Sequence, residues 1–379
     1  MSNDDLAARA ERWASTMAGN QSDSIVVAHA DSWAGSGESR AIERQAREDV
    51  LDAQLARLAT RSTGAGRRAI AEEPDPYRTC FERDRDRILH ATAFRRLAGK
   101  TQVFVFPDDH QRTRLTHALE VAQVAVSVAR PLGLNIALTE AIALGHDCGH
   151  GPGGHASEDA LSPYVPGGFD HATWGADVTL SPLNLCTETL DGIRNHSWSR
   201  PAPMTPEGEV VSWADRIAYV CHDFEDAVAA GLVTPVTLPD LVRGACGTTR
   251  SSQLRAFITS MIRATHETGR IGMQPNEAEA LAAFRQFNYD NIYMRDASRA
   301  QAKSVIDLLR ALVEHYASHP ELMLGGSPSH TRIAPVRSDD AFHDAVGFVG
   351  GMTDRYACRQ GLALLGFDEA RLPKGIDVT

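Results

Sequence analysis

The chain has 379 residues, of which 43% are hydrophobic and 23% are charged, a composition typical of a soluble globular protein with one large domain or two. Its formal net charge of −11 argues against a general nucleic-acid binder, whose surface is usually basic. Its 6 cysteines are scattered, without a CxxC pair, which argues against a disulfide framework and against a zinc ribbon.

The first 40 residues are rich in Ser, Asp, Gly and Ala with weak periodicity, which predicts a frayed arm with one short helix. The acidic start, MSNDDLAARAERW, lacks the apolar segment of a signal peptide. No run approaches the roughly 18 apolar residues of a membrane span, so we expect a cytoplasmic protein without a membrane partner. We place the end of this partly flexible arm at residue 60 and expect one domain over residues 61–379.

Helical spacing of apolar residues begins after Tyr77, in CFERDRDRILHATAFRRLAGKTQVF, and stops at PDDHQ. A strong helix follows in RLTHALEVAQVAVSVARPL (114–132), which ends at Pro131. Its apolar stripe, with steps of three and four, consists of Leu115, Leu119, Ala122, Val126 and Ala129.

The next helix, in LTEAIALGHD, has Thr139 as its expected N-cap and carries His146 and Asp147 at its end. The segment 209–231 predicts a long helix that stops at Gly231. Further helices are predicted at about 252–268, 276–290, 299–317 and 339–365. Without an alternating strand series or an internal repeat, the sequence predicts an all-α fold.

One stretch concentrates chemically active residues. ALGHDCGHGPGGHASED (143–159) has three histidines, two aspartates and a glutamate among five glycines. With a histidine on the preceding helix and an aspartate on the 209–231 helix, three packed helices can direct a metal-ligand set to one point. That set is His117, His146, Asp147 and Asp215. Imidazole and carboxylate together suit Mn, Mg, Co, Fe, Ni or Zn, and such an ion activates water and neutralises phosphate charge.

The glycine-rich loop predicts a phosphate-facing segment, because glycines let backbone and imidazoles approach a triphosphate closely. We expect His150 and His155 to flank the substrate rather than to complete the ligand set, since an open site needs free positions. Glu158, three residues after His155, is expected to fix the tautomer of that imidazole. Cys148 is expected to pack rather than to bind metal.

Three segments, RTRLTHALEVAQVA, ALGHDCGHGPGGHASEDAL and DRIAYVCHDFEDA, resemble the HD-domain deoxynucleoside triphosphate triphosphohydrolases, specifically the bacterial dGTPase-like proteins. The segments FERDRDRILHATAFRRLAGKTQVF, GGFDHATWGADV, LNLCTETLDGIRNHS and GMTDRYA extend the resemblance from about residue 75 to 360. It implies an HD-domain helical bundle with extra helices, with a metal-site core at about 114–230 and a C-terminal helical part at 231–379.

The resemblance also implies a role for each matching position. The metal ligands are His117, His146, Asp147 and Asp215, and manganese is the ion most expected. The catalytic residues are His155, its acidic partner Glu158, and His150, which contacts the α-phosphate. The substrate contacts are Arg114 and His171 on the phosphate side, Gln102 at the sugar 3′-hydroxyl, and Tyr219 and Asp223 at the deoxyribose.

Structural alternatives stay open for several of these positions. They are a solvated Arg114, a turn-capping Gln102, a core Tyr219, an Asp223 paired with a surface cation, and a His196 that only packs or supports a ligand. For Arg95, Arg96 and Lys100 we expect structural salt bridges rather than substrate contacts.

The implied activity is metal-dependent hydrolysis of a dNTP, either dGTP or a broader range, to deoxynucleoside and inorganic triphosphate. The alternatives are an HD phosphohydrolase or phosphodiesterase for another nucleotide, and a nucleotide-binding regulator with little turnover. The resemblance further implies a homo-oligomer, often with a dNTP as allosteric effector. Single-stranded nucleic acid is a weaker candidate partner, given the acidic charge.

Two departures from the family pattern put the base preference in doubt. GHGPGGH replaces a stretch that usually has a Pro-Phe pair, so Gly153 stands near an expected aromatic residue and predicts a wider or more mobile loop. FDHATWG carries Ala172 where the family pattern has asparagine, and the region before the 187–196 block is short.

Overall fold

The computed structural model describes residues 3–37, 40–103, 105, 111–324 and 333–373. The chain divides into two compact units, Met1–Glu43 and Arg44–Thr379. The first unit contains α1 (Asn3–Thr16) and an antiparallel hairpin of β1 (Asn20–Ser22) and β2 (Ile25–Val27). The short helix predicted near the N-terminus is therefore accompanied by a hairpin that the weak periodicity did not predict.

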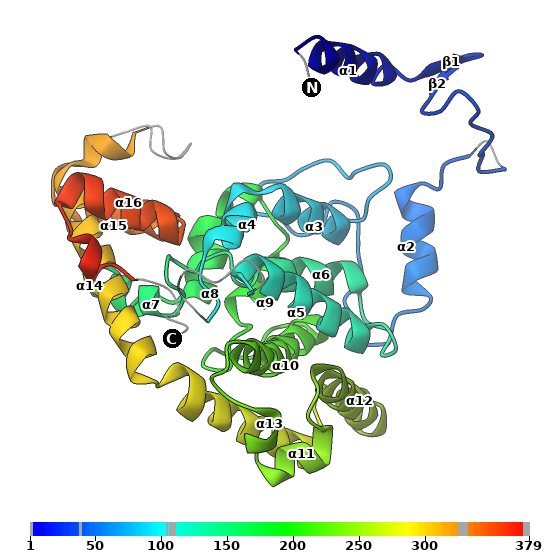
Figure 1. Cartoon of the computed structure of the whole chain (residues 1–379). Coiled ribbons are helices and arrows are strands. Elements are labelled where there is room, and N and C mark those ends of the chain that lie inside the picture. Colours follow the sequence, from blue (N-terminus) through cyan, green and yellow to red (C-terminus); the bar gives the residue numbers. More distant parts are fainter. Residues whose placement is uncertain (1–2, 38–39, 104, 106–110, 325–332, 374–379) are drawn as a thin grey trace. The chain divides into compact units, whose positions relative to one another are not determined.

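The described part of the second unit is helical, as Figure 1 shows. The helices that precede the glycine-rich loop are α2 (Arg44–Asp52), α3 (Cys80–His90), α4 (Thr92–Arg96), α5 (Arg114–Ala129) and α6 (Ile136–Gly145). They are followed by α7 (Ala156–Leu161), α8 (His171–Trp174), α9 (Thr187–Arg194) and α10 (Pro206–Ala229). The C-terminal part contains α11 (Asp240–Cys246), α12 (Arg250–Thr268), α13 (Pro275–Asn288), α14 (Asp296–Ser318), α15 (Asp339–Gly350) and α16 (Asp354–Leu365).

The main core lies among α3, α5, α6, α9 and α10, which pack against one another. Helix α6 is mostly apolar and mostly buried, as expected of a central helix, and its one charged residue, Glu140, pairs with Arg85. A second apolar cluster joins α7, α14, α15 and α16. The all-α prediction is confirmed. No helix among the described residues is long and apolar enough to cross a membrane.

The buried face of α5 differs from the predicted stripe. Leu119 is 48% exposed, whereas the fully buried side chains include Val121, Val124 and Val128. Helix α5 has two apolar faces, and the one centred on Val121 packs against α6 and α10. The predicted stripe is partly buried, since Ala129 is buried and Leu115 and Ala122 pack against the core. A step pattern alone does not say which of two apolar faces a neighbouring helix covers.

Two predicted boundaries are also wrong. Asn135, not Thr139, caps α6: its side chain accepts a hydrogen bond from the Leu138 amide, and Thr139 lies inside the helix with its hydroxyl on the Asn135 carbonyl. The predicted helix at 339–365 is two helices, because α15 ends at Gly350. The freed carbonyls of Gly350 and Gly351 accept hydrogen bonds from Lys100 and Arg96.

Candidate active site

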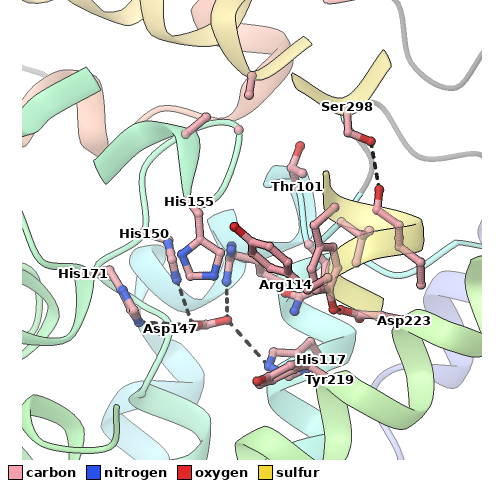
Figure 2. Close-up of a pocket in the computed structure, with 18 of the residues that line it drawn as sticks. Thr101, Arg114, His117, Asp147, His150, His155, His171, Tyr219, Asp223 and Ser298 are labelled. Carbon is pink, nitrogen blue, oxygen red and sulfur yellow. Dashed lines mark hydrogen bonds and ion pairs between the residues drawn. The ribbon is translucent and has the colours of Figure 1, made fainter. Parts of the chain in front are cut away.

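A cavity of about 540 Å³ opens between α5, α10, the glycine-rich loop and the start of α14. Figure 2 shows several of its side chains directed inward. Most of the predicted site residues line this cavity, although they come from distant parts of the chain. They are Gln102, Arg114, His117, Asp147, His150, His155, His171, Asp215, Tyr219 and Asp223. His146 and Glu158 do not line the cavity but contact residues that do. His146 lies beside Asp147 and Asp215, and Glu158 binds His155 and His171.

The predicted metal ligands meet at one point. His117 projects from α5, Asp215 from α10, and His146 and Asp147 from the turn that ends α6. His117 Nε2 lies 3.0 Å from Asp215 Oδ1. His146 Nε2 lies 3.5 Å from Asp147 Oδ1 and 3.6 Å from Asp215 Oδ1. Ligand atoms of His117, His146 and Asp215 lie within 4.8 Å of one another, and Asp147 adjoins this group through His146.

The environment of His146 tests whether a cation fits. Its Nδ1 lies 2.6 Å from the Ala143 carbonyl oxygen, which only accepts, so Nδ1 carries the hydrogen and Nε2 presents a lone pair. That Nε2 is buried and has no hydrogen-bond partner among the described residues. A lone pair buried beside two carboxylates fits a divalent cation, and the mixed nitrogen and oxygen donors are those of a transition metal.

The charges of the cluster also favour a cation. Burial opposes ionisation of Asp147, but Arg114 and His146 hold its pKa well below the ordinary value. Burial likewise opposes ionisation of Asp215, whose pKa His117 and His146 hold well below its ordinary value. Burial disfavours the charged form of His146, yet the two carboxylates raise its pKa to about 9, so a proton occupies the Nε2 lone pair until a cation takes its place. The carboxylates therefore remain ionised and attract positive charge to the centre of the cluster.

Arg114 is a buried arginine that faces the cavity, which excludes the alternative of a solvated side chain. It is 2% exposed, and its Nη1 donates to Asp147 Oδ2 at 2.7 Å. Its Nε and Nη2 are buried and have no hydrogen-bond partner among the described residues. Gly154 makes room for it: with φ +64°, a Cβ there would lie 2.9 Å from Arg114 Nη2. Two donors of the guanidinium are thus available to an anion.

Glu158 holds two histidines rather than the one predicted. Its Oε2 lies 3.1 Å from His155 Nδ1, and its Oε1 lies 2.7 Å from His171 Nδ1. Burial raises the pKa of this carboxyl, but hydrogen bonds from both imidazoles lower it strongly, so Glu158 is ionised. His155 is exposed at the cavity, whereas His171 is buried and stacks on His150 at a ring distance of 3.7 Å.

The predicted sugar contacts also line the cavity. The Tyr219 hydroxyl accepts a hydrogen bond from Arg285 Nε at 2.9 Å. Asp223 is 3% exposed and accepts hydrogen bonds from Arg112 and from the Tyr293 hydroxyl. Its partner is therefore a buried arginine, not the surface cation of the alternative. The Oε1 of Gln102 is buried without a partner among the described residues.

The glycine-rich loop is held by a residue that the sequence analysis missed. Asp354, at the start of α16, accepts hydrogen bonds from the Gly153 amide at 2.8 Å and from the Thr101 amide and hydroxyl. A Cβ at Gly153 would lie 2.5 Å from Val305 Cγ1. Val305 of α14 therefore occupies the space beside Gly153, and the wider or more mobile loop stays a prediction. The family-like segment GMTDRYA contains Asp354 and was the available signal.

Lys100 and Arg96 have structural roles, as predicted, but their hydrogen-bond partners differ from those expected. Lys100 is buried and donates to the carbonyl oxygens of His150 and Gly350, and Arg96 donates to that of Gly351. Lys100 and Arg96 therefore bind backbone carbonyls instead of forming the predicted salt bridges. The two bonds of Lys100 link the glycine-rich loop, at His150, to the end of α15, at Gly350. Burial raises the pKa of Cys148 to about 12, and its Sγ contacts the Leu144 carbonyl.

Comparison with known proteins adds independent information. Residues 114–220 match the HD domain, and residues 271–361 match the phosphohydrolase-associated domain. A deoxyguanosinetriphosphate triphosphohydrolase-like protein of Caldanaerobacter subterraneus subsp. tengcongensis is 36% identical over 337 residues, covering 87% of this chain and 96% of the relative. A protein of the same description from Clostridium perfringens strain 13 is 37% identical, covering 85% and 94%. A solved structure of a hypothetical protein from Aquifex aeolicus shares 17% identity, with a TM-score of 0.48 over 76% of this chain and 69% of that chain.

Proposed function

Because this chain belongs to the HD-domain family of deoxyguanosinetriphosphate triphosphohydrolase-like proteins, we propose that it hydrolyses a deoxynucleoside triphosphate to deoxynucleoside and inorganic triphosphate. The substrate is dGTP or a broader range of dNTPs. The observation that carries the proposal is the buried guanidinium of Arg114, with two unpartnered nitrogens beside the His/Asp cluster. A guanidinium fork placed there suits the oxygens of a phosphate.

The proposed ligands of the cation are His117, His146 and Asp215, which have ligand atoms close together, and Asp147, which adjoins His146. Manganese is the first choice among Mn, Mg, Co, Fe, Ni and Zn. When bound, a divalent ion polarises a phosphate oxygen and lowers the pKa of a water molecule.

The residues of the chain then have defined tasks. Arg114 binds the α-phosphate and His150 contacts it. Water adds its oxygen to the α-phosphorus, and the bond from phosphorus to the 5′-oxygen breaks. His155, oriented by Glu158, delivers a proton to the leaving 5′-oxygen. The hydroxyl of the water stays on the triphosphate and its proton is released, so atoms and charge balance.

Three further residues that line the cavity are proposed to recognise the sugar. Gln102 is proposed to face the 3′-hydroxyl and Asp223 to hydrogen-bond the deoxyribose. Tyr219 is proposed to form the floor that excludes a 2′-hydroxyl. The proposal also includes a homo-oligomer, a dNTP effector, a cytoplasmic location, and a division into an arm of residues 1–60 and one HD phosphohydrolase domain of residues 61–379.

Product analysis tests the proposal against its alternatives. The purified protein is incubated with Mn²⁺ and each dNTP, singly and in pairs, and the products are separated by chromatography. Deoxynucleoside and triphosphate in equal amounts are expected, together with loss of turnover in EDTA and recovery with Mn²⁺. Release of orthophosphate or pyrophosphate indicates a different HD phosphohydrolase. Nucleotide binding without turnover, under all dNTP pairs, indicates a regulator.

A further inference from the structure

Asp223, the predicted sugar contact on α10, is held by two other segments of the chain. Its Oδ1 accepts a hydrogen bond from Arg112 Nη2, and its Oδ2 accepts one from the Tyr293 hydroxyl. Arg112 lies two residues before α5, and Tyr293 ends the π-helical segment Tyr289–Tyr293. Asp223 and Tyr219 both project from α10 (Figure 2), and both line the cavity. A buried carboxylate at the cavity is thus fixed through both of its oxygens.

The guanidinium of Arg112 is fully engaged with carboxylates. Beside its bond to Asp223, its Nε donates to Asp226 Oδ2 at 2.9 Å and its Nη1 donates to Glu120 Oε2 at 3.3 Å. Arg112 is buried, and it is not among the described residues that line the cavity. Burial opposes its charge, but Asp223 and Asp226 raise its pKa above the ordinary value. Arg112 therefore stays charged and can act on a bound ligand through Asp223.

The three carboxylates place Arg112 between α5 and α10. Glu120 belongs to α5, whereas Asp223 and Asp226 are three residues apart on α10. The planar guanidinium has a rigid fork of donors, so it leaves little freedom to the groups that it binds together. Arg114, which is proposed to bind the α-phosphate, begins α5 two residues after Arg112. Arg112 therefore fixes the sugar acceptor relative to the segment that carries the phosphate donor.

Both partners of Asp223 donate, so a further partner of this carboxylate must also donate. A carboxylate has about four acceptor positions, and two of them remain here. In a deoxynucleoside triphosphate the 5′-oxygen carries the phosphates, and the only free hydroxyl of the sugar is at the 3′ position. An acceptor at the deoxyribose therefore recognises the 3′-hydroxyl as a donor.

We propose that Arg112 and Tyr293 are positioning residues that set the recognition of the substrate 3′-hydroxyl through Asp223. This inference rests on the proposed function for the class of substrate. Without Arg112, or without the Tyr293 hydroxyl, one oxygen of Asp223 loses its partner and the carboxylate can turn toward the donor that remains. The 3′-hydroxyl then loses an acceptor held in the productive geometry. Only substrates that have this hydroxyl are affected.

Nucleotides with and without the 3′-hydroxyl test this inference. The value of kcat/KM is measured with Mn²⁺ for dGTP and for 2′,3′-dideoxyguanosine triphosphate, in the wild type, Arg112→Lys and Tyr293→Phe. A hydrogen bond to a charged group corresponds to a factor of about 10 to 150 in kcat/KM, so the wild type should prefer dGTP by about that ratio. Both variants should lose about tenfold with dGTP and change by less than about twofold with the dideoxy nucleotide.

Matched variants outside the cavity show the effect of a purely structural change. The Arg68 side chain is buried in an ion pair, and the hydroxyl of the buried Tyr316 donates a hydrogen bond. Arg68→Lys and Tyr316→Phe should change kcat/KM equally for the two nucleotides. Circular dichroism checks that each variant is folded. Tyr293→Phe removes a single oxygen atom and keeps the test decisive if Arg112→Lys does not fold.

The ratio of the two nucleotides decides the outcome. A wild type without preference for dGTP, or an unchanged ratio in both folded variants, overturns the inference, and an unchanged ratio in one variant removes that residue from it. If the wild type binds dGTP without hydrolysing it, dissociation constants measured with Mn²⁺ by calorimetry replace kcat/KM in the same comparison. A ratio that collapses in the variants then supports the positioning role although the proposed function is refuted. Absence of both dGTP binding and hydrolysis overturns both.

Discussion

Replacing Arg114 by lysine separates the two tasks that the structure gives this side chain. A lysine ammonium can still pair with Asp147, as Arg114 Nη1 does at 2.7 Å. It cannot also present the two nitrogens, Nε and Nη2, that are buried without partners. Arg114→Lys should therefore keep the fold and the cation and lose contacts to the phosphate.

The size of the loss follows from the number of hydrogen bonds. One hydrogen bond to a charged group contributes about 1.5–3 kcal/mol. Losing it in the transition state lowers kcat/KM by about 10- to 150-fold, since about 1.4 kcal/mol is a factor of ten. Loss of both donors places the expected fall at or above the upper end of that range.

Initial rates of triphosphate release over a range of dNTP concentrations measure this effect. Arg130→Lys, an exposed arginine at the end of the same helix, should change kcat/KM by less than twofold. Bound manganese is counted for both variants to exclude an indirect effect through Asp147. A kcat/KM within threefold of wild type for Arg114→Lys, with manganese retained, would refute the assignment of Arg114 to the phosphate.

Three more predictions test the loop, the buried lysine and the sugar site. Gly154 and Gly167 both have positive φ, but only a Cβ at Gly154 would meet Arg114 Nη2, at 2.9 Å, whereas nothing lies within 4 Å at Gly167. Both alanine variants should lose about 1 kcal/mol of stability from backbone strain, and only Gly154→Ala should also lose kcat/KM; equal activities would contradict the role of the loop. Burial lowers the pKa of Lys100 to about 8, against the opposing effect of Asp354, while an unfolded lysine titrates near 10.4. The unfolded chain therefore binds more protons between these values, and wild-type stability should rise by about 1.5 kcal/mol from pH 8 to 9.5 relative to Lys100→Met; urea unfolding curves that shift equally in both proteins would argue against it. Tyr219→Ala should admit ribonucleoside triphosphates, measured as the ratio of kcat/KM for dGTP and GTP, and an unchanged ratio would exclude Tyr219 as the floor of the sugar site.

The local features of the site were readable from the sequence. The order of His117, His146, Asp147 and Asp215 on consecutive helical patterns predicted a common point, and the structure brings these side chains together. The pairing of Glu158 with His155 was also predictable, since three residues span one helical turn. The Glu158–His155 contact follows from the short spacing of the two residues. The metal cluster was predictable because several histidines and aspartates on buried helices have few roles other than metal binding.

Long-range contacts were not readable in the same way. Asp354 binds Gly153 and Thr101 although 201 and 253 residues of chain, respectively, separate it from them. His196 faces His171 only because α8 and α9 pack side by side. Both residues lie in segments that resemble the family, GMTDRYA and LNLCTETLDGIRNHS, but neither segment indicates which distant residues they contact.

The sequence by itself determined that the protein is helical, that three of its helices carry imidazoles or carboxylates, and that a glycine-rich loop follows the second of these helices. These properties follow from periodicity and residue type, which are local. Only the tertiary structure decided which face of α5 is buried, where Lys100 and Arg96 donate, and that Glu158 serves two histidines. Those outcomes depend on which helices lie against each other, and packing between distant segments is set by the shape of the whole core rather than by the spacing of residues along one helix.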